Sequence, residues 1–129
     1  MAFLLQNMDV GQTPPIAYMQ ATGGETIQLG EALVLSADGL LTKCGAEAKP
    51  EYIAVGPKGE ANAVPVVKVQ DYQLWETQLS AAGDALKVGN KVTLDADGLR
   101  VTATTAGGVA AIVEMVGAAV GDSVRVRFA

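Results

Sequence analysis

Histidine is absent from the 129-residue chain, and cysteine occurs once, as Cys44. Histidine is the most common general base and metal ligand near neutral pH, so its absence removes the simplest route to acid–base catalysis. A nucleophilic cysteine needs an activating neighbour, and the sequence suggests none for Cys44. A single cysteine cannot form an intramolecular disulfide, which fits a reducing cytoplasm. We therefore predict no catalytic residues and no enzymatic activity.

Long apolar runs are also missing, although hydrophobic residues make up 50% of the chain. A membrane-spanning helix needs about 20 consecutive apolar residues, and no stretch approaches that length. The apolar stretch at residues 2–5 is short and has no basic residues before it, so we predict no secretion signal. The sequence thus predicts no membrane partner.

Positive charge is sparse, with nine basic against fourteen acidic residues and a net charge of −5. Proteins that bind nucleic acid usually carry a basic stripe that neutralises phosphates, and here the basic residues are scattered. We therefore predict no nucleic-acid partner. Arg125 and Arg127 alternate along an expected strand and share one face of it, which is either a solvated face or a salt-bridging face for a partner's carboxylates.

An internal repeat is the strongest positive signal. The segment GETIQLGEALVLSADGL at 24–40 aligns without a gap with GDALKVGNKVTLDADGL at 83–99, 59 residues later. Identical residues recur at the glycines, at Ala-Asp-Gly and at the leucines around that step, far more often than chance allows. The similarity continues loosely downstream and ends in an alternating strand in each half, so the chain is a duplication.

Turn chemistry stands at the same places in both copies. An Ala-Asp-Gly step follows each alternating apolar strand, and Asp and Gly both accept the left-handed backbone of a hairpin turn. A further glycine precedes each of these strands, where we expect a turn or bulge in which a β-carbon would clash. The expected structural turn positions are Gly30, Asp38, Gly39, Gly89, Asp97 and Gly98.

The aspartates of these turns could also be imagined as a metal site. Hairpin chemistry explains them, however, and no spaced run of oxygen ligands resembles a calcium loop. The glycines of residues 56–60 are not followed by a helix that could receive a phosphate. We predict neither a metal nor a cofactor.

These patterns predict an all-β fold, a compact β-barrel or β-sandwich made from two tandem pseudo-symmetric β-units. We expect one β-domain over residues 24–129, with repeat units at about 24–70 and 83–128 and a connector at 71–82. Residues 1–23 precede the repeat and are expected to form an extended N-terminal arm.

The arm has too many apolar residues for a solvated tail, and its two prolines favour an extended course. We expect it to dock either on its own domain or on a neighbouring subunit. Its candidate partner-binding residues are Phe3, Leu4, Leu5, Pro14, Pro15, Ile16, Tyr18 and Met19.

The connector contains Tyr72, Leu74 and Trp75, which give it substantial apolar area. Trp75 is the single tryptophan of the chain and is expected to anchor either the core or a subunit interface. We treat the three residues as a possible subunit interface.

Together with the terminal VGAAVGDSVRVRFA at 116–129, the two copies resemble the small capsid decoration, or cement, proteins of tailed bacteriophages. The resemblance covers most of residues 24–129, and its motifs are turns and strands. Such proteins are similar in role to the head-stabilising protein of lambda-like phages. The resemblance implies a β-barrel or β-tulip-like fold and a homotrimer or homodimer on the outer capsid surface of the virion, after synthesis in the host cytoplasm. It also implies contacts with the major capsid protein, but it identifies no single binding residue.

A second hypothesis is a β-barrel binding module for a carbohydrate or another small ligand. It would use Trp75, Tyr72 and Tyr52 as stacking surfaces and requires them to converge on one exposed concave site.

Overall fold

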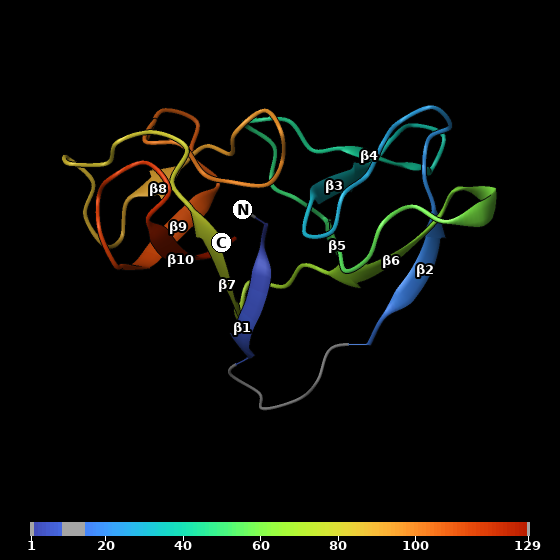
Figure 1. Cartoon of the computed structure of the whole chain (residues 1–129), viewed down its shortest axis with the longest axis horizontal. Helices are drawn as coiled ribbons and strands as arrows, with labels where there is room; N and C mark the ends of the chain where they lie inside the picture. The colour runs from blue at the N-terminus through green and yellow to red at the C-terminus, as the bar shows by residue number, and fades with distance from the viewer. Residues whose placement is uncertain (1, 9–14, 129) are drawn as a thin grey trace.

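The computed structural model describes residues 2–8 and 15–128 and consists of two five-stranded antiparallel sheets, which lie side by side in Figure 1. The all-β prediction is confirmed. The described strands form no closed barrel and fit a sandwich of two units. Within these described ranges, the one helical segment is a short 3-10 turn at Glu60–Asn62.

Each sheet is assembled from strands that are distant in the sequence. The first sheet has the order β1 (Leu4–Met8), β7 (Gln73–Gln78), β10 (Ser123–Arg127), β9 (Ala110–Met115) and β8 (Lys91–Val92). The second has the order β2 (Ala17–Gln20), β6 (Ala63–Lys68), β5 (Tyr52–Ala54), β3 (Ala32–Leu35) and β4 (Leu41–Lys43). Burial alternates strictly along β7 and β10, which is the period of two that places one side of a strand in the core.

The duplication extends into the strand pairing. In the first unit Ala17 of β2 is paired with Val66 of β6. The residues 59 positions later are Glu76 of β7 and Arg125 of β10, and these are paired in the same way. Strand β7 is therefore the counterpart of β2, so the first structural unit comprises β2 to β6 and the second comprises β7 to β10. The segment expected to be a connector is a strand with neighbours on both sides.

That difference has a physical cause. A backbone ladder needs N–H and C=O groups in register, whereas the side chains of the two strands are free to diverge. The side chains of β2 and β7 have diverged. The structural repeat therefore includes these two strands, although they lie outside the segments whose sequences are similar.

The N-terminal segment is likewise part of the sheets where it is described. Strand β1 pairs with β7, and β2 pairs with β6. Phe3 is buried, its ring centroid lies 5.3 Å from that of Phe128, and its backbone N–H donates to the Gly30 carbonyl at 3.1 Å. Of the two docking modes expected for the arm, the described residues adopt the one on their own domain.

The main hydrophobic core is shared by both units. It includes Ile53 and Val67 from the first unit, and Trp75 and Val126 from the second. A smaller cluster around Leu33 lies within the first unit alone. Backbone hydrogen bonds also join the units, from the Ala32 N–H to the Gly98 carbonyl at 2.8 Å and from the Leu94 N–H to the Ala46 carbonyl at 2.9 Å.

The Ala-Asp-Gly steps form equivalent turns. The Gly39 N–H donates to the Ser36 carbonyl at 2.9 Å, and the Gly98 N–H donates to the Asp95 carbonyl at 3.0 Å. Both glycines have positive φ, +75° and +71°, a conformation that glycine adopts without steric cost. The aspartates before them, Asp38 and Asp97, complete the same turns.

The glycines that precede the hairpin strands differ from each other. Gly30 has φ +81°, and a β-carbon there would lie 2.2 Å from the Ala2 Cβ. Gly89 has φ +96°, but a β-carbon there would meet nothing within 4 Å. The expected clash therefore exists at Gly30 and not at Gly89, where the backbone conformation alone favours glycine.

Candidate interaction surface

An apolar hollow of about 240 Å³ lies where β1 and β7 of one sheet meet β5 and β6 of the other. Its lining, which we call the Trp75 hollow, consists of Phe3, Leu4, Leu5, Ile16, Leu29, Ala54, Val55, Val67 and Trp75. The residues come from six separate segments, so the hollow exists only because the N-terminal strand docks beside both units.

The rim of the hollow is exposed, whereas its floor is buried. Leu4, Ile16 and Leu29 are 49%, 59% and 54% exposed. The described residues include eight exposed large hydrophobic side chains, and these three gather around one hollow. Single exposed apolar residues are common on protein surfaces, but a cluster around a concavity is typical of a contact surface.

Trp75 belongs to the floor and is 1% exposed. The indole Nε1 is buried, and no described residue accepts its hydrogen bond. A buried tryptophan N–H usually has an acceptor, so this donor is an exception. Trp75 is thus a core residue of its own chain that also borders the surface hollow.

The other two residues of the possible subunit interface lie near Trp75 in sequence but differ in environment. Tyr72 and Leu74 are both half-buried. The Tyr72 carbonyl accepts a hydrogen bond from Arg127 Nη1 at 3.1 Å. The backbone of Leu74 is paired with Asn7 of strand β1, which occupies this edge of β7. Part of this expected interface is therefore occupied by the chain's own N-terminal strand.

Strands β1 and β2 stand at the ends of their sheets. The outer edge of β7 is covered by β1, but its counterpart β2 pairs only with β6 among the described strands. Tyr18 of β2 is 75% exposed and Met19 packs against the small core cluster. Pro15 and Ile16 precede the strand and are exposed, and Pro14 lies outside the described residues.

The direction of the free groups on β2 follows from its neighbour. The Pro65 carbonyl accepts from the Val55 N–H at 2.8 Å and therefore points to β5. Pro65 is paired with Tyr18, so their pair is not hydrogen-bonded, and the Tyr18 N–H and C=O point to the outer edge. The open edge is thus a short template for another strand.

Arg125 and Arg127 find partners within the chain. Arg125 lies 3.4 Å from a Glu76 carboxylate oxygen and 3.7 Å from one of Glu114, both on neighbouring strands. Of the two alternatives for this strand face, the structure shows salt bridging, but to carboxylates of the same molecule.

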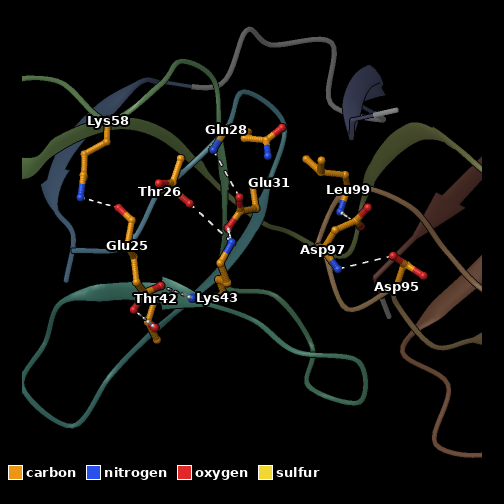
Figure 2. A network of polar contacts seen from close by, with 10 residues as sticks. All are labelled: Glu25, Thr26, Gln28, Glu31, Thr42, Lys43, Lys58, Asp95, Asp97 and Leu99. Atoms are coloured by element: carbon orange, nitrogen blue, oxygen red, sulfur yellow. Dashed lines mark hydrogen bonds and ion pairs between the residues drawn. The ribbon is translucent and has the colours of Figure 1, made fainter. Parts of the chain in front are cut away.

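A polar network surrounds Glu31, a residue that sequence analysis did not single out. Figure 2 shows the fully buried Glu31 carboxylate facing the Lys43 ammonium group at 3.1 Å, and it also accepts from the Gln28 N–H at 3.2 Å. Nearby, the Thr42 hydroxyl donates to Glu25 at 2.6 Å. A buried carboxylate with these partners fixes the loop before β3. The second copy has Asn90 at the position equivalent to Glu31, so comparison of the two copies could not predict this network.

The aromatic residues of the small-ligand hypothesis do not share a site. Trp75 lines the apolar hollow, whereas Tyr52 lines a different one together with charged Lys49, Glu51 and Lys68. The described structure therefore does not form the single aromatic platform that this hypothesis requires.

The Cys44 thiol is held in an unreactive state. Burial, with a further contribution from the charge of Glu51, raises the pKa of the Cys44 thiol to about 11, and its Sγ–H donates to the Ala48 carbonyl at 3.0 Å. A thiol with this pKa remains protonated near neutral pH and is a poor nucleophile. Over residues 2–8 and 15–128, no three His, Cys, Asp or Glu side chains group as a metal site.

Within the described part of the chain, no helix has the length and apolar character needed to cross a membrane. Comparison with protein-family models gives no match, and a search of curated proteins finds no significant relative.

Proposed function

We propose that the chain is a structural, non-enzymatic capsid decoration protein that binds the outer surface of an assembled phage head. In this role it stabilises contacts between major capsid protein subunits. The observation that carries the proposal is the surface formed by the open β2 edge and the exposed apolar rim of the Trp75 hollow. The resemblance of the repeat and the terminal strand to decoration proteins supplies the identity of the partner.

The mechanism follows from the chemistry of this surface. An open edge binds an extended segment through main-chain hydrogen bonds, and adjacent apolar pockets select its side chains. Each contact is small, but many copies on a symmetric shell act together, particularly if the chain assembles with itself as a trimer or dimer. A protein that binds the assembled shell and not its free subunits stabilises the shell by mass action.

The proposal is tested with shells assembled from the major capsid protein encoded in the same genome. The full-length chain is mixed with these shells and with unassembled capsid protein, and binding is measured by co-sedimentation and size exclusion. We expect saturable binding to shells and a higher temperature of shell disruption. Absence of binding to shells at micromolar concentrations would contradict the proposed function.

A further inference from the structure

A second hollow, of about 320 Å³, lies where strand β5 begins and strand β6 ends. We infer that it binds a carboxylate group carried by an apolar body, with the ammonium groups of Lys49 and Lys68 facing the carboxylate. The inference goes beyond the proposed function and does not rest on it, since that function uses the β2 edge and the Trp75 hollow. The lining, which we call the Tyr52 hollow, consists of Lys49, Pro50, Glu51, Tyr52, Lys68 and Val69.

Strand pairing brings the two lysines to one place. Tyr52 and Lys68 are paired directly across β5 and β6, so their side chains share one face of the sheet. Lys49 comes from the loop before β5 and is followed by Pro50, which is buried and has a fixed φ. Tyr52 is half-buried and packs against the small core cluster, whereas both lysines are exposed. The hollow therefore has a fixed wall and two cations at its surface.

These cations differ from the other basic side chains because they have no partner in the chain. Over residues 2–8 and 15–128, three lysine side chains form neither an ion pair nor a hydrogen bond, and they are Lys49, Lys68 and Lys87. Two of these three line the Tyr52 hollow. In a chain with a net charge of −5, two unpaired positive charges around one concavity favour an anionic ligand.

The charge of the lining selects a singly charged anion. Glu51 also lines the hollow, but its Oε1 accepts from the Leu35 N–H at 3.1 Å. Two lysines and one glutamate give the lining a formal charge of two minus one, or +1. A carboxylate balances this charge, whereas a phosphate group carries about −1.5 to −2 at neutral pH.

The rest of the lining selects an organic acid over an inorganic ion. Pro50, Tyr52 and Val69 give the hollow a carbon wall next to the two ammonium groups. An inorganic anion would leave this wall in water, whereas an apolar body attached to the carboxylate covers it. The volume of about 320 Å³ lies at the lower end of the roughly 300–1,000 Å³ of small-molecule sites. A small aryl or alkyl carboxylate fits, and so does a glutamate side chain of a peptide.

Phenylacetate is a suitable probe, and phenylacetamide is its neutral counterpart of the same shape. Binding is measured by NMR chemical-shift titration of the isotope-labelled full-length chain at neutral pH and fixed ionic strength. We expect phenylacetate to shift the amide signals of Glu51, Tyr52 and Val69 with a dissociation constant on the order of millimolar, typical of so small a ligand. Phenylacetamide, which offers no charge to the lysines, should bind about tenfold more weakly.

Lys87 provides a matched control, because it is exposed and unpaired like the two lysines but lies outside the hollow. K49Q, K68Q and K87Q each remove one positive charge from the surface. We expect K49Q and K68Q each to weaken phenylacetate binding about threefold, the double variant about tenfold, and K87Q to bind like the wild type. Equal weakening by K87Q would show that the ligand senses only the net charge, and it would overturn the site.

Further ligands test the class and the source of the carboxylate. Inorganic phosphate that binds more tightly than phenylacetate, with the same dependence on the lysines, overturns the assignment to a carboxylate. Equal binding of phenylacetamide, or no shifts at tens of millimolar phenylacetate, overturns the inference as a whole. The peptide acetyl-Gly-Glu-Gly-amide, with its Gln counterpart as control, supports a protein segment as the natural source if it binds more tightly than phenylacetate, and a free organic acid if it binds more weakly. No capsid shells are used, so failure here leaves the proposed function standing.

Discussion

Gly30 and Gly89 occupy the same position in the two copies, but the structure requires glycine at each for a different reason. Both have positive φ, which costs an L-residue about 1–2 kcal/mol. At Gly30 a methyl group would also overlap Ala2, which is attached to the docked N-terminal strand. Overpacking of this kind typically costs a further ~1–3 kcal/mol.

We therefore predict that G30A lowers the free energy of unfolding by more than G89A does. Urea unfolding followed by Trp75 fluorescence measures both variants, and the difference between them isolates the contact with the N-terminal segment. Equal losses would show that the segment is not packed against Gly30 in solution.

Cys44 shows how burial changes the chemistry of one side chain. Its folded pKa of about 11 lies above the roughly 8.5 of an unfolded cysteine, so the folded state holds the proton more tightly. The stability that the protonated, buried thiol gives the folded state is therefore fully present below about pH 8.5, and it is lost as the pH rises towards 11.

We predict that iodoacetamide modifies Cys44 much more slowly in the native protein than in urea at pH 8, because only the thiolate reacts. Mass spectrometry over time measures both rates. The counterpart position in the second copy is Ala103, so C44A should fold and serve as the unreactive control. Similar rates with and without urea would contradict the buried environment.

At the scale of elements, a substitution in strand β2 can change its free edge without removing a hydrogen bond between β2 and β6. The Tyr18 N–H points away from β6, so a proline at this position removes a donor that the sheet does not use. Y18A removes the same side chain and keeps the donor. We predict that both variants fold with similar stability and that Y18P binds assembled shells several-fold more weakly than Y18A.

Co-sedimentation measures the affinity of Y18P and of Y18A for assembled shells, and the difference between them reports on the backbone N–H donor at the edge of β2. Binding of Y18P and Y18A with the same affinity would exclude strand addition at β2, while leaving the Trp75 hollow as an independent contact.

The elements also show what the sequence could predict. The alternating strands and their Ala-Asp-Gly turns were predictable because their signal is local and occurs twice. Strand β7 was not, because its equivalence to β2 lies in backbone register, while residues such as Ala17 and Glu76 share no chemistry. The Trp75 hollow was not predictable either, since its lining joins residues as far apart as Phe3 and Trp75.

At the scale of the whole molecule, the shared core makes the two units dependent on each other. Ile53 is fully buried in the first unit and packs in the same cluster as Trp75 and Val126 of the second. A unit separated from its partner would expose this face to water. We therefore expect cooperative, two-state unfolding of the entire chain and not two successive transitions.

I53A tests this coupling, because removing a buried isoleucine side chain beyond Cβ costs about 2–5 kcal/mol. Trp75 fluorescence reports on the second unit, and far-UV circular dichroism reports on both. If the core is shared, I53A shifts the urea midpoints of both signals by the same amount, although the substitution lies in the first unit. L33A, in the cluster confined to the first unit, should also shift both midpoints together if the chain unfolds in one transition. A fluorescence midpoint that stays at the wild-type value in I53A would mean that the second unit folds independently, although its core residues pack in one cluster with Ile53.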